Sequence, residues 1–179
     1  MEENLTKFYE KTIFSEQKFH GRVIDVYVDT VETPVGTSTR ELVKHPGGVC
    51  VAAVEDDAVY MVKQYRKGVE QALLELPAGK LEYGEDPLAC GMRELGEEAG
   101  LLADEWISLG KIYPTPGFCS EIIYLYLAKG LHPCAQNLDD GEFLSVEKIP
   151  LDTLVEQIMH DEICDAKTVA GILKAKLYL

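Results

Sequence analysis

The chain has 179 residues, of which 46% are hydrophobic and 27% are charged, and its formal net charge is −14. This composition is typical of a soluble globular protein with one full core. The negative charge disfavours binding to the phosphate backbone of nucleic acids and to anionic membranes.

The start of the sequence has no apolar signal core, and no apolar run approaches the length that spans a membrane. The five cysteines form no CxxC pair, which favours free thiols in a reducing compartment. We therefore expect a cytoplasmic protein with no membrane partner and no nucleic-acid partner.

Residues 1–45 are predicted to form a separate small β element. Residues 18–33 alternate in places between apolar and polar side chains, which favours strands, and 33–36 are typical of a turn. The segment is too short to hold its own core. We expect it to pack on the remaining domain, 46–179, or on a second subunit.

The domain 46–179 is predicted to combine strands with helices. Two β-rich apolar runs flank an acidic turn at 55–57 and predict a hairpin. The predicted strands are 47–54, 58–65, 73–76, 107–113, 122–128 and 143–146; one helix follows residue 86, and two more lie within 151–179, separated near 161–165. This order predicts an α/β fold, with a mixed sheet covered by helices on both faces.

The central helix has clear boundaries in the sequence. Asp86 can cap it, Pro87 suits its first turn, and Gly100 suits its C-terminal stop. Four apolar residues recur at i, i+4, i+7 and i+11 and predict a stripe facing the core: Leu88, Met92, Leu95 and Ala99.

Three glutamates, Glu94, Glu97 and Glu98, are expected on the other side of this helix. Like charges at this spacing repel by about 0.2–0.5 kcal/mol per pair, and Arg93 lies one turn before Glu97 to offset it. One interpretation is a solvated helix face. The other is a site for a hard divalent cation, since magnesium takes oxygen ligands.

Residues 79–101 resemble the Nudix hydrolase signature. That signature requires a glycine, a glutamate six positions later, and then a helix with the pattern Arg-Glu-aliphatic-any-Glu-Glu-any-Gly-aliphatic. The chain supplies every specified position: Gly79, Glu85, Arg93, Glu94, Leu95, Glu97, Glu98, Gly100 and Leu101. We call residues 79–101 the Nudix box.

The resemblance implies an α/β/α sandwich and metal-dependent hydrolysis of a nucleoside diphosphate linked to another group. It makes Glu94 and Glu98 the principal metal ligands, with Glu97 a further ligand and the carbonyl of Ala78 another. Arg93 would orient the glutamates. The implied ion is Mg²⁺, and Mn²⁺ suits the same oxygen ligands. Glu82 and Glu85 lie in the loop facing the start of the helix, and either is a further ligand or a solvated acid. For Glu85 we favour a structural role in the box.

Two glutamates outside the box are candidates for the general base. Glu142 precedes a late strand, where several ADP-ribose hydrolases carry a loop glutamate, and Glu121 lies in the segment PGFCSE. We prefer Glu142, and a solvated loop acid is the competing interpretation.

Features outside the box resemble the ADP-ribose pyrophosphatase branch of the Nudix family. Pro116 lies in a proline-bearing loop like that of the branch, and Arg66 matches an arginine that contacts substrate phosphates. Arg40 and Glu41 are expected near the terminal ribose or adenine. The branch commonly forms dimers by exchanging N-terminal strands, so we expect a homodimer.

The resemblance implies Mg²⁺-dependent hydrolysis of ADP-ribose to AMP and ribose 5-phosphate. A second hypothesis keeps the chemistry but changes the substrate to another nucleoside diphosphate sugar, such as GDP-mannose. A third is a protein that senses ADP-ribose without cleaving it.

Overall fold

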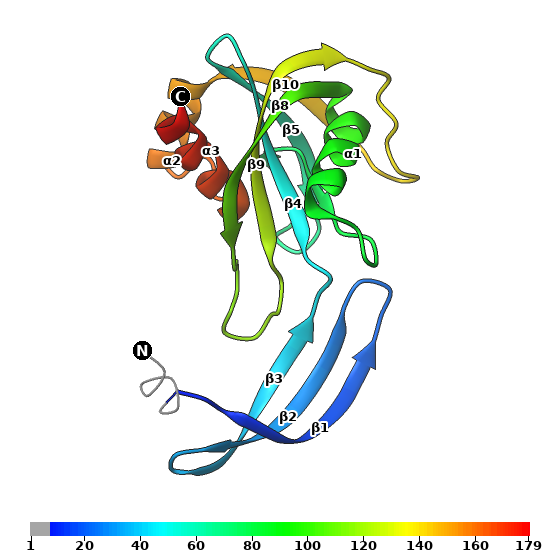
Figure 1. The fold of residues 1–179 in the computed structure, drawn as a ribbon, viewed down its shortest axis with the longest axis vertical. Coiled ribbons are helices and arrows are strands. Elements are labelled where there is room, and N and C mark those ends of the chain that lie inside the picture. Colours follow the sequence, from blue (N-terminus) through cyan, green and yellow to red (C-terminus); the bar gives the residue numbers. More distant parts are fainter. Residues whose placement is uncertain (1–7) are drawn as a thin grey trace. The chain divides into compact units, whose positions relative to one another are not determined.

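The computed structural model describes residues 8–179. The chain divides into two compact units (Figure 1). The first consists of Met1–Pro46 and Thr115–Glu121, and the second of Gly47–Pro114 and Ile122–Leu179. The boundary expected after residue 45 lies next to Pro46, but a loop distant in sequence also belongs to the first unit.

The first unit is a three-stranded antiparallel sheet in the order β1–β2–β3. Its strands are β1 (Lys11–His20), β2 (Asp25–Thr33) and β3 (Gly36–Lys44). All ten residues of β1 are exposed, and Val31 is the one buried hydrophobic residue among those described in this unit. The sheet therefore has almost no core of its own.

The loop Thr115–Glu121 is attached to this sheet through β3. The amide of Val43 donates to the carbonyl of Phe118 at 2.7 Å, and the amide of Ser120 donates to the carbonyl of Val43 at 2.9 Å. These two bonds form a short parallel bridge between Val43 and Cys119.

The second unit contains a seven-stranded mixed sheet and three helices. Its elements are β4 (Gly48–Glu55), β5 (Ala58–Arg66), β6 (Gln71–Glu75), β7 (Ala78–Lys80), α1 (Pro87–Ala99), β8 (Leu101–Ile112), β9 (Ile123–Pro133), β10 (Leu144–Pro150), α2 (Leu151–Met159) and α3 (Ala166–Tyr178). The main strand order is β10–β5–β4–β9–β8, with β6 beside β5 and β7 beside β4. The β4–β9 pair is parallel, and the other pairs are antiparallel.

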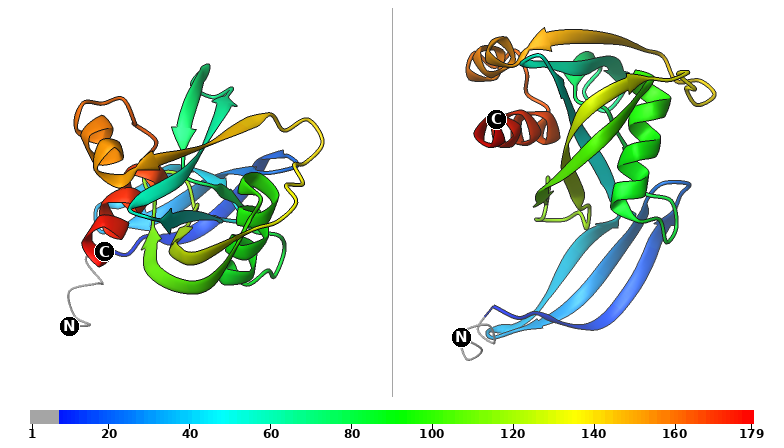
Figure 2. Two further views of the ribbon diagram at one scale, coloured as in Figure 1. Left: turned by 90° about the horizontal axis from the view of Figure 1, so that it is seen from above. Right: turned by 45° about the horizontal axis from the view of Figure 1, so that its top comes forward.

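Helices cover both faces of this sheet, as the two views of Figure 2 show: α1 lies on one side, and α2 and α3 lie on the other. Strand β4 explains why both faces need covering, because it is buried from Gly48 to Val54. Its side chains point alternately to the two faces of the sheet, and each face has its own hydrophobic core. Cys50 and Ala52 pack with α2 and α3, whereas Val51 and Ala53 pack with α1.

The predicted hairpin between β4 and β5 is present, with a two-residue turn. Asp56 and Asp57 have φ angles of 52° and 58°, the left-handed conformation that tight hairpin turns require. Strands β8 and β9 are longer than expected, and the three-residue β7 was not predicted. Among the described helices, none is long and apolar enough to cross a membrane.

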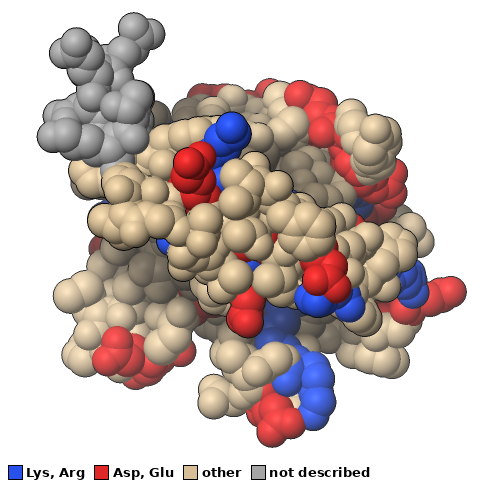
Figure 3. Space-filling model, turned by 90° about the horizontal axis from the view of Figure 1, so that it is seen from below, with Lys and Arg blue, Asp and Glu red and all other residues tan. Residues whose placement is uncertain are grey.

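Charge on the surface is mixed. On the face shown in Figure 3, most basic side chains lie next to acidic ones. Local ion pairs such as Lys18–Glu16 and Lys67–Glu70 are of this kind, with both partners exposed. Exposed pairs contribute little to stability.

Candidate active site

Helix α1 begins and ends where the sequence predicts. The carboxylate of Asp86 accepts hydrogen bonds from the amides of Leu88 and Ala89, and Gly100 ends the helix in the left-handed conformation with φ of 65°. The predicted apolar stripe is displaced, because Met92 is exposed and the buried positions are Cys90, Gly91, Leu95 and Glu98. The helix therefore turns a glutamate toward the sheet.

Glu98 is 2% exposed, so the prediction that it lies on the side of α1 opposite the core is wrong. Its Oε2 accepts a hydrogen bond of 2.8 Å from the amide of Ala78, the first residue of β7. The pKa of Glu98 is raised to about 8, mainly by burial and also by the charges of Glu142 and Glu94, while the bond from Ala78 opposes the rise. This carboxylate lies where a negative charge is costly without a cation.

Glu94 lies over the backbone of Gly79. A β-carbon added at Gly79 would fall 1.9 Å from the carboxyl carbon of Glu94, so glycine leaves the space that this carboxylate fills. Burial raises the pKa of Glu94, Arg93 opposes that rise, and Glu97 and Glu142 add to it. Glycine at position 79 of the box is thus required to leave space for the carboxylate of Glu94.

Arg93 holds three glutamates of the box. Its NH1 donates to Oε1 of Glu94 and to Oε2 of Glu97, both at 2.8 Å, and its Nε and NH2 donate to Glu85 at 3.0 and 3.1 Å. The bond from Arg93 is the main reason that the pKa of Glu85 falls to about 2. Glu85 is thus engaged with the arginine, and Glu82 is exposed.

Glu142 lies in the same electrostatic environment as the box. Its charge raises the pKa of both Glu94 and Glu98. Its Oε1 accepts a hydrogen bond of 2.9 Å from Nε2 of Gln64 on β5. Glu121, the other candidate base, belongs to the first unit, where its Oε1 lies 3.5 Å from Nδ1 of His45.

Arg66, at the end of β5, forms a fork with a carboxylate that the sequence did not single out. Its Nε and NH2 donate to the two oxygens of Glu75 at 2.8 and 2.7 Å, and Glu75 is 1% exposed. The signal available in the sequence was a charged residue inside the apolar run Ala72–Leu73–Leu74–Glu75–Leu76. Buried charges are almost always paired, so a glutamate in this apolar run predicts a cationic side chain beside it.

The other predicted substrate residues belong to the first unit. Arg40 is paired with Glu10, and Glu41 and Pro116 are exposed. The box, Arg66 and Glu142 belong to the second unit.

Hard oxygen donors dominate the box. Within residues 8–179, no three His, Cys, Asp or Glu side chains converge closely enough to hold an ion as they stand. Glu94 and Glu97 each give one oxygen to Arg93, which leaves each a second oxygen for an ion. This donor set suits a hard divalent cation. The pKa values of Glu94 and Glu98 are raised mainly by burial, and a cation would offset the negative charge of these buried carboxylates.

A model of the NUDIX domain family matches residues 44–170, more than half of the chain. The chain belongs to the Nudix family. The box geometry described above is therefore that of a Nudix domain, and the resemblance found in the sequence is confirmed. Nudix hydrolases generally use divalent metal ions.

The chain is similar over nearly its whole length to several known proteins. It is 46% identical over 169 residues to the methanol dehydrogenase activator of Bacillus methanolicus, covering 92% of this chain and 91% of that protein. It is 45% identical over 167 residues to the ADP-ribose pyrophosphatase of Bacillus subtilis (strain 168), covering 91% and 90%. The ADP-ribose pyrophosphatase of Mycobacterium tuberculosis is 35% identical over 168 residues, with 91% and 81% covered.

The fold is also that of a solved structure. The crystal structure of an ADP compounds hydrolase superposes with a TM-score of 0.84 and covers 95% of this chain and 94% of that one, at 22% identity. The predicted α/β Nudix fold with a mixed sheet is confirmed.

Proposed function

We propose that this Nudix protein hydrolyses ADP-ribose to AMP and ribose 5-phosphate, with Mg²⁺ as its cofactor and Mn²⁺ as an alternative. The observation that carries the proposal is the 45% identity with an ADP-ribose pyrophosphatase over 91% of the chain, in a protein whose box keeps every glutamate. Water adds to one phosphorus, the bridging pyrophosphate bond breaks, and the two products each keep one phosphate.

The box residues would hold the ion. Glu94, Glu97, Glu98 and the carbonyl of Ala78 supply the oxygen ligands, and Arg93 fixes the orientation of Glu94 and Glu97. A divalent ion held there would supply positive charge against the pyrophosphate and make water a stronger nucleophile.

Glu142 is proposed as the general base. Its charge raises the pKa of Glu94 and of Glu98, which supports a role beside these proposed metal ligands. It is half-buried and keeps one oxygen beyond the bond from Gln64, and that oxygen can take the proton of the attacking water.

Substrate contacts are proposed for both units. Arg66 binds the phosphates with the donors that Glu75 leaves unused. Arg40, Glu41 and the loop of Pro116 contact the terminal ribose or adenine. The exposed aromatic residues of the first unit, including Phe14 and Phe19 of β1, support a homodimer with exchanged strands. We place this dimer in the cytoplasm, without a nucleic-acid partner.

The test is product analysis of purified protein with ADP-ribose and with GDP-mannose, each with Mg²⁺ or with a chelator. The second substrate is included because GDP-mannose pyrophosphatases of Yersinia are 26% identical over 167 residues. AMP formed from ADP-ribose only with metal is the expected result. Faster cleavage of GDP-mannose would overturn the substrate assignment, and binding of ADP-ribose without cleavage would identify a sensor.

A further inference from the structure

A group of charged side chains is buried at the start of α3, outside the Nudix box. Lys167 donates through Nζ to Oε2 of Glu75 and to Oδ2 of Asp165. The side chain of Lys167 is 13% exposed and that of Glu75 is 1% exposed. Buried ions of this kind persist only with close partners, and Lys167 has one on each side.

The N-terminal cap of α3 fixes the position of Lys167. Oδ2 of Asp165 accepts the amide and the hydroxyl of Thr168 at 3.0 and 2.7 Å, in addition to the Lys167 ammonium at 2.9 Å. The negative charge of Asp165 is therefore used by the helix cap and by Lys167 together.

Thr168 connects the same turn to the backbone before the box. The amide of Leu76 donates to Oγ1 of Thr168 at 3.0 Å, and two residues later the amide of Ala78 donates to Glu98 at 2.8 Å. The segment from Glu75 to Ala78 thus lies between the start of α3 and the buried glutamate of the box.

Glu75 is shared by two cations. Oε2 accepts from both NH2 of Arg66 and Nζ of Lys167, and Oε1 accepts from Nε of Arg66. A guanidinium has five N–H donors, so this fork leaves three of those of Arg66 free for a ligand. The side chain of Arg66 is 38% exposed, which keeps these donors accessible.

The charge balance explains why a second cation is useful here. Glu75 alone would neutralise Arg66 and leave a pair with no net attraction for an anion. With Lys167 and its second partner Asp165 included, the four side chains are neutral, and without Lys167 they would carry one net negative charge beside Arg66.

We propose that Lys167 is a positioning residue for the phosphate-binding arginine, acting through Glu75 to fix the orientation and the available charge of Arg66. The proposal deepens the proposed function, because it assumes that Arg66 contacts the phosphates of the substrate.

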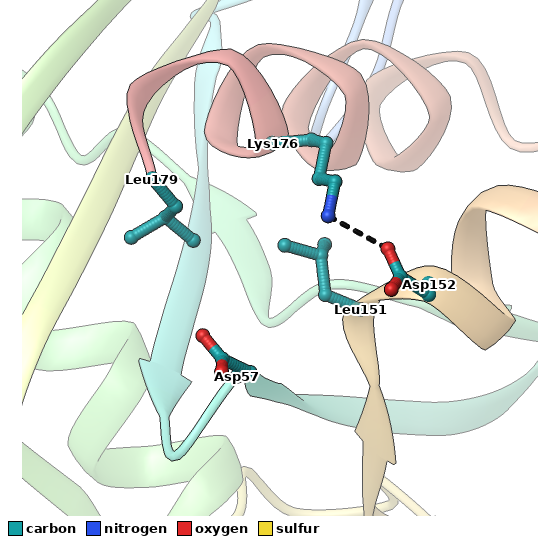
Figure 4. A pocket seen from close by; sticks show the side chains of 5 residues that line it. All are labelled: Asp57, Leu151, Asp152, Lys176 and Leu179. Atoms are coloured by element: carbon teal, nitrogen blue, oxygen red, sulfur yellow. Dashed lines mark hydrogen bonds and ion pairs between the residues drawn. The ribbon is translucent and has the colours of Figure 1, made fainter.

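Kinetics of three variants test it. Lys167→Met keeps the length of the side chain without its charge, Lys167→Arg keeps the charge, and Lys176→Met is the matched control. Lys176 lies on the same helix, and its Nζ forms an exposed ion pair of 2.7 Å with Asp152, which lines the same pocket (Figure 4).

We expect Lys167→Met to raise KM for ADP-ribose about 10-fold, with kcat changed less than about threefold. Lys167→Arg should restore most of the affinity, and Lys176→Met should resemble the parent. In an Arg66→Ala background, Lys167→Met should raise KM no further, because its effect passes through Arg66. An unchanged KM in Lys167→Met, or a full additional effect without Arg66, would overturn the proposal.

A buried charge left without its partner can prevent folding, so a second variant is needed. Glu75→Gln with Lys167→Met removes both charges at nearly constant volume and leaves no buried carboxylate unpaired. The same rise in KM is expected from this double variant, and a parental KM would contradict the assignment.

Side-chain NMR gives a readout that does not depend on the substrate. The chain has four arginines, so the Nε–H signal of Arg66 can be assigned by its loss in Arg66→Lys. Lys167→Met should shift this signal and speed its exchange with water, and should leave the Arg93 signal in place. If the parent protein fails to cleave ADP-ribose, the proposed function fails. If the Arg66 signal is unchanged in Lys167→Met, the present inference fails.

Discussion

The side-chain Nε2 of Gln64 donates a hydrogen bond of 2.9 Å to the carboxylate of Glu142. This bond attaches the acidic loop before β10 to strand β5. The two residues are 78 positions apart in the sequence. The other amide atom of Gln64, Oε1, is buried without a hydrogen-bond partner in the described part of the chain. The side chain of Gln64 therefore orients Glu142 through Nε2, while its Oε1 remains a buried acceptor without a hydrogen bond.

Replacing Gln64 with leucine should lower kcat about 10-fold, because Glu142 would lose the bond that orients it. KM should change little, since Gln64 is not assigned to substrate. Stability should be nearly unchanged, because the unpaired Oε1 disappears with the amide. Steady-state kinetics and thermal unfolding measure both effects. The matched control is Gln71→Leu on the neighbouring strand β6, where the side chain is exposed.

The two candidate bases are separated by paired variants. Glu142→Gln should lower kcat by a factor of about 10²–10⁴, the usual contribution of a general base, with KM close to that of the parent. Glu121→Gln should leave kcat within about threefold, because the proposed base is Glu142, whose charge acts on Glu94 and Glu98. A larger loss in Glu121→Gln than in Glu142→Gln would reverse the assignment.

Gly79→Ala should affect activity more than stability. The added β-carbon would overlap the carboxylate of Glu94, which is the end of a flexible side chain and can move at low energetic cost. Metal binding and turnover should fall by at least about 10-fold, whereas the melting temperature should fall by only a few degrees. Metal titration, kinetics and calorimetry give the three values.

Gly96→Ala is the control for this substitution. Gly96 lies on the same helix, and the nearest atoms to its added β-carbon are 3.9 Å away. It should stabilise the protein by about 0.5–1 kcal/mol through helix propensity and leave activity unchanged. If both glycine variants lose activity equally, the overlap with Glu94 is not the cause.

Glu98 makes the stability of the metal-free protein depend on pH. Its pKa is raised from the ordinary 4.5 to about 8, so the folded state binds its proton more tightly than the unfolded state does. The contribution of Glu98 to the free energy of unfolding therefore becomes less favourable as the pH rises from about 4.5 to about 8. In the presence of a chelator, Glu98→Gln should be more stable than the parent by about 3 kcal/mol at pH 7, and no more stable at pH 4.

The same variant should lose most of its turnover, since Glu98 is a proposed ligand. Denaturant unfolding at several pH values and an assay with Mg²⁺ provide the comparison. Retained activity would remove Glu98 from the metal site, and a stability difference independent of pH would show that folding does not raise the pKa of Glu98.

The size of the protein in solution tests the proposed exchange of N-terminal strands. All residues of β1 are exposed, including Ile13, Phe14 and Phe19, and such a surface favours a partner. Light scattering during size exclusion should give the mass of a dimer, about twice 19.9 kDa. A monomer that remains active at assay concentrations would contradict the exchange.

Local signals in the sequence were sufficient for much of the fold. Asp86 and Gly100 defined α1, and the two aspartates after Glu55 marked the β4–β5 hairpin. The helix ends and the hairpin turn each depend on a few neighbouring residues, so the local sequence predicts them. The family and the fold class followed from the spacing of the box.

Contacts between distant residues were not predictable in the same way. A helical pattern assigns charged residues to solvent, which is why the burial of Glu98 was missed and Met92 was placed in the core. Lys167 and Glu75 are 92 positions apart, and nothing in the sequence pairs them. Strand β7 has only three residues, one of them glycine, and forms because β4 offers it a backbone partner.

The first unit is built from two separate stretches of chain, and this limits how the protein can be shortened. Removal of Met1–Pro46 would leave Thr115–Glu121 behind, because that loop is inserted between β8 and β9. The carbonyl of Phe118 and the amide of Ser120 would then lose their bonds to Val43. An isolated catalytic unit therefore requires a second cut, with a short linker joining Pro114 to Ile122.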